Sequence, residues 1–499
     1  MDALHELIKS LTPSEKGYFK KAASRFEGTD GNNYLKLFDA IEVLREYDEA
    51  QLKKDFKGKK FLKQFSVAKN YLYESILKSL TAYHAEEHIE AKVFALFSQT
   101  QILIDKGLYP QAFKILTKGI SIADEHELFG LRFQLHLLER KIYLLQPFDK
   151  EAHYPVETLI ETNRKTADLL NNYTKFLELH YQQRALISES YIVKDSERKT
   201  AHQKIYNETE KQNSASLSAK IIQSDIRINY FSSKADYANS YKQIEESLRL
   251  VKKHPYFNQY EQISSVILYD LLLTDALRTG NMKAFEKHLK DFKKLEIKTE
   301  PVKISAHLSY ARFALVYYDY KNDKAQLMKL VDETESAIKT YGAKIRKDLH
   351  LGVIIAFTSG LLEYGEYSRV LDWIELYKQY PKIDRHYDFQ GVLLLFQLMA
   401  HYELNNLEFV HNILENVEYF LKKNKQKSKF EEIVLRGFKN LCVITEKEKL
   451  HKNLKNYLEE INQYLQSDSA VRNNVALPIF EAFIKSKLEH KAYHAFMGR

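Results

Sequence analysis

Residues 106–120, KGLYPQAFKILTKGI, contain the helix-pairing pattern that decides the fold. Gly107 is followed two residues later by Tyr109. The small residues Ala112 and Gly119 come next, at a spacing that places both on one side of a helix. A glycine lets the chain turn tightly, an aromatic ring fills the space between two helices, and small residues allow a close approach. The stretch therefore predicts one helix ending near Gly107 and a second helix folding back along it.

This pattern of a turn residue followed two positions later by an aromatic or apolar residue recurs down the chain. Gly365 and Tyr367 repeat it, and Gly280 repeats it with larger side chains in the helix that follows. Successive turns are 45, 42, 43 and 40 residues apart. Each unit would therefore hold two helices of roughly 17–20 residues. The turn positions of this series are Ala235, Gly280, Asn322, Gly365 and Asn405.

The spacing resembles the turn and second helix of a tetratricopeptide repeat, in which each unit is a pair of helices. The resemblance implies an all-α, right-handed superhelical solenoid, here with a period of about 43 residues where the strict repeat has 34. The 128 residues from Gly107 to Ala235 span about three periods, which predicts further turns near positions 150 and 193. Such an array, covering residues 86–499, would present a concave face suited to a peptide or a partner helix.

Residues 1–85 differ from the rest and predict a separate domain of short helices. The segment 12–15, TPSE, is a helix start in which a threonine caps the end, a proline follows and a glutamate completes a capping box. Residues 26–33, FEGTDGNN, predict a loop. A helix over Tyr34–Tyr47 and a longer helix after Gly58 should follow. The segment 49–80, a short helix, Gly58 and then that longer helix, has the outline of a helix-turn-helix.

The composition favours an all-helical protein. The 499 residues include 15 glycines and 8 prolines, too few for the many tight turns of a sheet protein. Cys442 is the single cysteine, which excludes an internal disulfide and a cysteine-based zinc cluster. The longest apolar runs are too short to cross a bilayer, and the N-terminus lacks an apolar signal region. We therefore expect a cytoplasmic protein without a membrane anchor.

Basic side chains gather around Gly58 and face a single acid, Asp55. Lysines near a helix turn can neutralise nucleic-acid phosphates, and the net charge of +8 permits an anionic partner. Two features favour the alternative of a solvated basic surface: the overall charge excess is mild, and Lys54 stands where a helix-turn-helix needs a small residue. The lysines that would contact nucleic acid are Lys53, Lys54, Lys57, Lys59, Lys60, Lys63 and Lys69.

The fragment 84–88, HAEEH, matches the H-x-x-E-H signature of inverted zincin peptidases. In that interpretation His84 and His88 bind zinc while Glu87 activates the attacking water. The apolar stripe of the preceding helix argues against it, because its continuation would place Glu87 in the core. The pattern favours a junction between two domains, with His84 at the end of one helix and Glu86, Glu87 and Glu90 in the first turn of the next.

Three functions remain open from the residues alone. The first is a non-enzymatic interaction scaffold that binds a peptide or protein along the helical repeats. The second is a nucleic-acid-binding regulator with a basic N-terminal domain and a repeat sensor domain, and the third is a zinc peptidase. No Gly-rich phosphate loop, G-x-S-x-G, HExxH or CxxC motif is present, so we expect neither enzyme activity nor a cofactor. The pattern predicts neither the partner's identity nor the oligomeric state.

Overall fold

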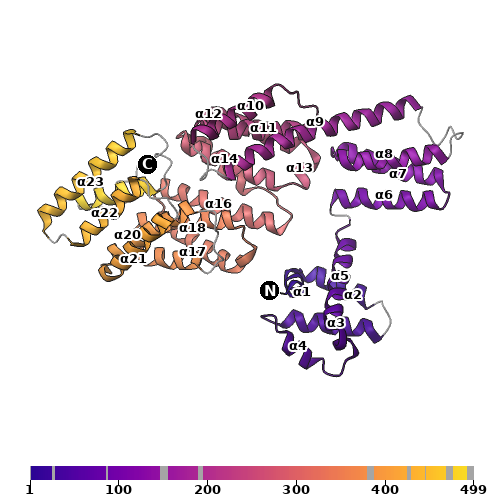
Figure 1. Cartoon of the computed structure of the whole chain (residues 1–499), viewed down its shortest axis with the longest axis horizontal. Coiled ribbons are helices and arrows are strands. Elements are labelled where there is room, and N and C mark those ends of the chain that lie inside the picture. The colour runs from indigo at the N-terminus through magenta and orange to yellow at the C-terminus, as the bar shows by residue number, and fades with distance from the viewer. Residues whose placement is uncertain are drawn as a thin grey trace. The chain divides into compact units, whose positions relative to one another are not determined.

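The computed structural model confirms the all-α class (Figure 1). It describes residues 2–24, 29–85, 88–145, 156–188, 195–378, 387–423, 429–443, 446–467, 476–489 and 491. Within these ranges the regular secondary structure is helical and no strand occurs. No helix in the described part of the chain is both long and apolar enough to span a bilayer.

The chain divides into two compact units. Unit 1 comprises Met1–Ile226 and Lys252–Glu261, and unit 2 comprises Arg227–Val251 and Gln262–Arg499, so that the division falls inside helices α11 and α12. A domain boundary at residue 85 stays a prediction. The helices that begin in unit 1 are α1 (Ala3–Ser10), α2 (Pro13–Ala23), α3 (Thr29–Val43), α4 (Glu49–Asp55), the 3-10 helix η1 (Lys60–Gln64), α5 (Phe65–Tyr83), α6 (Ile89–Asp105), α7 (Tyr109–Glu125), α8 (Phe129–Leu145), α9 (Val156–Ser188), α10 (Asp195–Glu210), α11 (Leu217–Ser233) and α13 (Pro255–Gln259).

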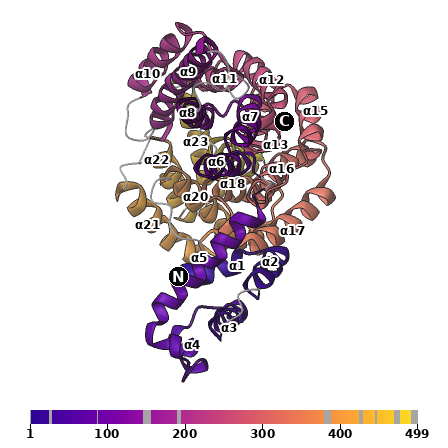
Figure 2. The same ribbon diagram turned by 90° about the vertical axis from the view of Figure 1, so that its right-hand side faces the viewer.

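Helices α1 to α5 form a bundle with a hydrophobic core of its own (Figures 1 and 2). The capping box predicted at the start of α2 is present, with Thr12 and Glu15 each accepting a hydrogen bond from the other's backbone amide. The predicted loop at 26–33 is wrong in its second half, because α3 already begins at Thr29. Residues 26–28 lie outside the described residues.

The predicted turn residues share one backbone geometry. All six have φ between 55° and 73°. In each turn the residue's own N–H bonds to the carbonyl three positions back, and the next N–H bonds to the carbonyl five positions back. This is the Schellman arrangement, which satisfies the free carbonyls at a helix C-terminus. The residues concerned are Gly107, Ala235, Gly280, Asn322, Gly365 and Asn405.

The next helix begins two residues beyond each of these turns, and the paired helices pack against each other wherever the pairing lies within one unit. Glu127, with φ of 51°, makes the same turn between α7 and α8, and the sequence pattern did not predict it. The turns expected near 150 and 193 fall on residues 146–155 and 189–194, outside the described residues.

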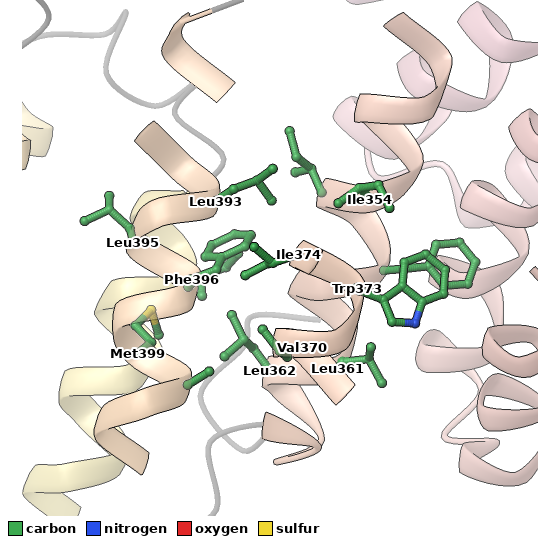
Figure 3. Close-up of a cluster of buried hydrophobic side chains, with 14 of the residues drawn as sticks. Ile354, Leu361, Leu362, Val370, Trp373, Ile374, Leu393, Leu395, Phe396 and Met399 are labelled. Atoms are coloured by element: carbon green, nitrogen blue, oxygen red, sulfur yellow. The ribbon is translucent and has the colours of Figure 1, made fainter. Parts of the chain in front are cut away.

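The part of unit 2 between residues 304 and 484 packs around a continuous hydrophobic core. Figure 3 shows Leu362, Ile374 and Phe396, from three successive helices, meeting in this core. Trp373 is 1% exposed, and its ring stacks on Phe357 at 4.7 Å between centroids. The other helices of the chain are α12 (Tyr237–Lys253), α14 (Ile263–Arg278), α15 (Met282–Lys293), α16 (Glu300–Tyr320), α17 (Lys324–Tyr341), η2 (Gly342–Lys344), α18 (Lys347–Glu363), α19 (Tyr367–Lys378), α20 (Tyr387–Glu403), α21 (Leu407–Lys423), α22 (Lys429–Val443), α23 (Lys447–Ser467) and α24 (Ala476–Glu489).

Candidate functional site

A cavity of about 660 Å³ lies within unit 1, between α6, α8, α9 and α13. Its wall is mainly apolar and aromatic, with Phe94 and Phe97 from α6, Phe129 from α8 and Tyr173 from α9. Ligand sites in proteins are commonly concave, apolar and of about 300–1,000 Å³, with a few placed polar groups. The cavity has this character, and it is the candidate binding site of the chain.

Local sequence explains why the cavity stays open. Gly130, the second residue of α8, lines it, and a Cβ added there would meet no atom within 4 Å. Phe94 contributes a ring that is 57% exposed, although large apolar side chains are usually buried. Phe133 and Leu137 extend the exposed apolar surface along α8, beyond the cavity itself.

Glu127 fixes the deep polar side of the cavity. Its carboxylate accepts hydrogen bonds from the backbone amides of Leu217 (3.0 Å) and Ser218 (2.7 Å) at the start of α11. Nε2 of His254 lies 3.2 Å from the same carboxylate. Burial alone would raise the pKa of Glu127, but these hydrogen bonds outweigh it and lower the pKa to about 2. The charge of Glu127 is thus already satisfied by the protein.

A second polar group beside the cavity is not satisfied in this way. His126 is 7% exposed, lines the cavity, and its Nδ1 is buried without a hydrogen-bond partner. Its ring meets Tyr260 edge to face at 5.7 Å between centroids. Burial lowers the pKa of His126, so the imidazole is neutral at pH 7.

Glu90 on α6 also lines the cavity and lies next to Tyr256 of α13. Burial and the Glu90 carboxylate together raise the pKa of the Tyr256 hydroxyl. Burial, and then the charge of Glu90, raise the pKa of Glu261. Within the described residues neither Glu90 nor Glu261 forms an ion pair, so negative charge collects at this end of the cavity.

The predicted nucleic-acid-binding lysines fall into two groups. Lys69 is half-buried and its Nζ contacts Asp2 (2.7 Å), the Tyr47 hydroxyl (2.8 Å) and Glu49 (2.9 Å). Lys53 pairs with Glu49 at 2.8 Å. Lys69 therefore joins α5 to Asp2 and α4, whereas the Lys53 pair lies within α4. The exposed lysines that make no ion pair with any described residue are Lys54, Lys57, Lys59, Lys60 and Lys63.

The segment 49–80 folds as a short helix, a turn and a longer helix. Gly58, with φ of 90°, lies in the turn between α4 and η1. The exposed positions of the first turns of α5 include Val67, Asn70 and Tyr71, and none of these is basic. The unpaired lysines thus cluster between α4 and η1, and they do not continue onto the exposed positions of the first turns of α5.

The HAEEH fragment joins two helices. His84 follows the last residue of α5, and His88 precedes the first residue of α6, so the two histidines do not share a helical face. Their ring centroids are 6.3 Å apart, and Nε2 of His84 lies 2.7 Å from Oε1 of Glu15. Glu87 lies outside the described residues. Among the described residues, no group of three His, Cys, Asp or Glu side chains is placed to hold a metal ion.

The residues of the repeat pattern have structural positions. Gly107, Gly280 and Gly365 occupy the turns, and the Cβ positions of the first two face open space. Tyr109 and Tyr367 begin the helices after their turns. Ala112 is fully buried between α6 and α7, as the close-packing argument requires.

Sequence reasoning missed the cavity, because its lining comes from residues between 90 and 257 that are far apart in the chain. The local sign of the cavity is Phe94, a large apolar residue at an exposed position of α6. Such a residue does not reveal which other parts of the chain line the cavity with it. Comparisons of the chain with protein-family models, curated proteins and solved structures gave no match.

Proposed function

We propose that this protein is a non-enzymatic interaction protein that binds a peptide segment of a partner in the cavity of unit 1. The observation that carries the proposal is the cavity of about 660 Å³ with the exposed ring of Phe94 in its wall. Apolar surface left open to water is stabilised when a ligand covers it, and such patches mark binding sites.

A peptide fits this surface better than a compact small molecule does. The apolar surface continues from the cavity onto Phe133 and Leu137 of α8, which an extended segment could cover. We also propose that the helix pairs form a right-handed, tetratricopeptide-like array, and the repeated turn geometry supports this proposal. A cytoplasmic location stays a prediction.

The test fills the cavity without disturbing the fold. In Gly130→Trp the indole would occupy the cavity, and the new Cβ would meet no atom within 4 Å. The matched control is Gly17→Trp, on the exposed side of α2, where the Cβ position is equally open. The full chain and both variants would be panned against a phage-displayed library of random twelve-residue peptides. We expect the wild type and Gly17→Trp to enrich the same peptides and Gly130→Trp to enrich none of them. Equal enrichment by Gly130→Trp would refute the proposal.

A second candidate function is nucleic-acid binding through the N-terminal bundle. The observation that favours it is the set of five exposed lysines around Gly58 that make no ion pair with described residues. Phosphate contacts by lysine release counterions, so this binding would weaken steeply as the salt concentration rises.

Labelled duplex DNA and single-stranded RNA of mixed sequence would serve as probes. The triple variant Lys57→Glu, Lys60→Glu and Lys63→Glu should lose binding at least tenfold and should flatten the salt dependence. The control carries the same charge change on α15, as Lys283→Glu, Lys287→Glu and Lys290→Glu, all at exposed positions. If both triple variants lost nucleic-acid binding equally, the loss would come from net charge alone, and binding through the lysines around Gly58 would be refuted.

A further inference from the structure

We infer that the peptide segment bound in the cavity carries a bulky apolar side chain beside a Lys or Arg, whose cation pairs with Glu90. The inference rests on the proposed function, and it names the chemistry of the partner. The observation that carries it is geometric: Glu90 lies in the wall of an otherwise mainly apolar cavity, and it forms no ion pair with any described residue.

The charge around the cavity is one-sided. Three glutamates approach it. Glu127 is held by His254 and two backbone amides, whereas Glu90 meets the Tyr256 hydroxyl but pairs with no described cation. Glu90 lies in the wall, and Glu261 is close enough for Glu90 to disfavour its ionisation. Lys92 is close enough for its charge to act on His126. Its side chain is exposed, however, and does not line the cavity. A positive group entering the cavity would therefore relieve a repulsion that the free protein retains.

The apolar part of the cavity supplies the anchor. Phe94, Phe97 and Leu135 form a wall on which an aromatic or large aliphatic side chain can be buried. Interfaces draw most of their affinity from such a buried anchor, and a neighbouring charged pair adds selectivity. An apolar side chain without the cation would leave Glu90 without a counter-ion, which is why we specify both.

The experiment extends the library selection to Glu90→Gln and to Glu125→Gln. Glu125 is exposed and outside the cavity, although its charge also acts on His126, so it matches the charge change without touching the ligand. Peptides enriched on the wild type should contain an apolar residue adjacent to Lys or Arg, and the same preference should appear on Glu125→Gln. On Glu90→Gln we expect the apolar preference to persist and the basic preference to vanish.

Binding of one enriched peptide and of its Lys→Gln or Arg→Gln form completes the test. On the wild type the uncharged peptide should bind about tenfold more weakly, and on Glu90→Gln the two peptides should bind equally. A basic preference that survives in Glu90→Gln, or apolar peptides enriched without any basic residue, would overturn the inference and leave the proposed function standing. Enrichment no greater than that on Gly130→Trp would overturn the proposed function itself.

Discussion

The carboxylate of Glu127 and Nε2 of His254 lie 3.2 Å apart, although 127 residues separate them in the sequence. Glu127 sits in the turn between α7 and α8, and His254 precedes α13. The same carboxylate also binds the backbone amides that begin α11. One side chain therefore connects three segments of unit 1 beneath the cavity.

Replacing Glu127 should destabilise unit 1 in a pH-dependent way. The pKa of Glu127 is lowered from an ordinary 4.5 to about 2, so the folded state gains stability above pH 4.5 and loses it as the pH falls toward 2. Glu127→Gln should cost about 3 kcal/mol at pH 7 and little at pH 2. Hydrogen exchange of the amides of α11 measures this locally. Glu125→Gln is the control. An equal loss of stability in Glu127→Gln at pH 7 and at pH 2 would show that the ionised carboxylate of Glu127 is not its cause.

In two turns of unit 2, replacing alanine by glycine and glycine by alanine should change the stability in opposite directions. Ala235 is exposed and has φ of 56°, a conformation that costs a residue with a Cβ about 1 kcal/mol. Ala235→Gly should therefore stabilise unit 2 by up to about 1 kcal/mol. Gly280→Ala should destabilise it by about 1 kcal/mol, since its φ is 68° and the new methyl would meet no neighbour. Urea unfolding followed by fluorescence of the single tryptophan reports both changes.

Lys69 should be essential to the stability of the N-terminal bundle, in contrast to the exposed lysines. It is 17% exposed, and its contacts with Asp2 and Glu49 raise its pKa against the effect of burial. Lys69→Met leaves Asp2 without its cation and Glu49 with Lys53 alone, and it should destabilise the bundle by about 2–3 kcal/mol. Lys57→Met, made at an unpaired and exposed position, should change stability by less than about 0.5 kcal/mol. Hydrogen exchange of the backbone amides of α1 and α5 would distinguish the two variants. Equal protection in Lys69→Met and Lys57→Met would show that Lys69 does not stabilise the bundle.

Glu363 at the end of α18 should make unit 2 less stable in alkaline solution. Burial, and then the charge of Asp319, raise the pKa of Glu363 from an ordinary 4.5 to about 8. The folded state therefore favours the protonated carboxyl. Its contribution to stability is fully present below pH 4.5, and it is lost as the pH rises from 4.5 through 8. Glu363→Gln should remove at least about 1 kcal/mol of that loss, measured by tryptophan fluorescence during urea unfolding at pH 5 and pH 9. Glu333→Gln, at an exposed carboxylate, should leave the pH dependence unchanged.

Local features of the fold could be predicted from the sequence, while the site could not. Gly107 and Asn405 mark turns because a Schellman turn depends on a few consecutive residues, and so does the capping box at Thr12. The cavity depends on which distant helices meet, and nothing near Glu90 in the sequence reveals Tyr256. The turn at Glu127 was missed because a glutamate rarely adopts positive φ.

The lysine cluster shows a similar limit. The sequence places Lys69 and Lys57 in one basic stretch, and charge alone does not separate them. The partners of Lys69 come from residues 2 and 49, which only the folded bundle brings together. Burial and pairing thus divide a set of residues that appeared uniform in the sequence.

The packing order of unit 2 has a consequence for how the chain is made. Most helix contacts among the described residues of this unit join elements that are one or two places apart along the chain, although Lys487 of α24 also pairs with Glu403 of α20. Such short-range connectivity corresponds to a low contact order, which favours rapid folding. A hairpin leaving the ribosome can dock on the one synthesised just before it, without waiting for the C-terminus. Loss of the last hairpins during synthesis should accordingly leave the earlier ones able to fold.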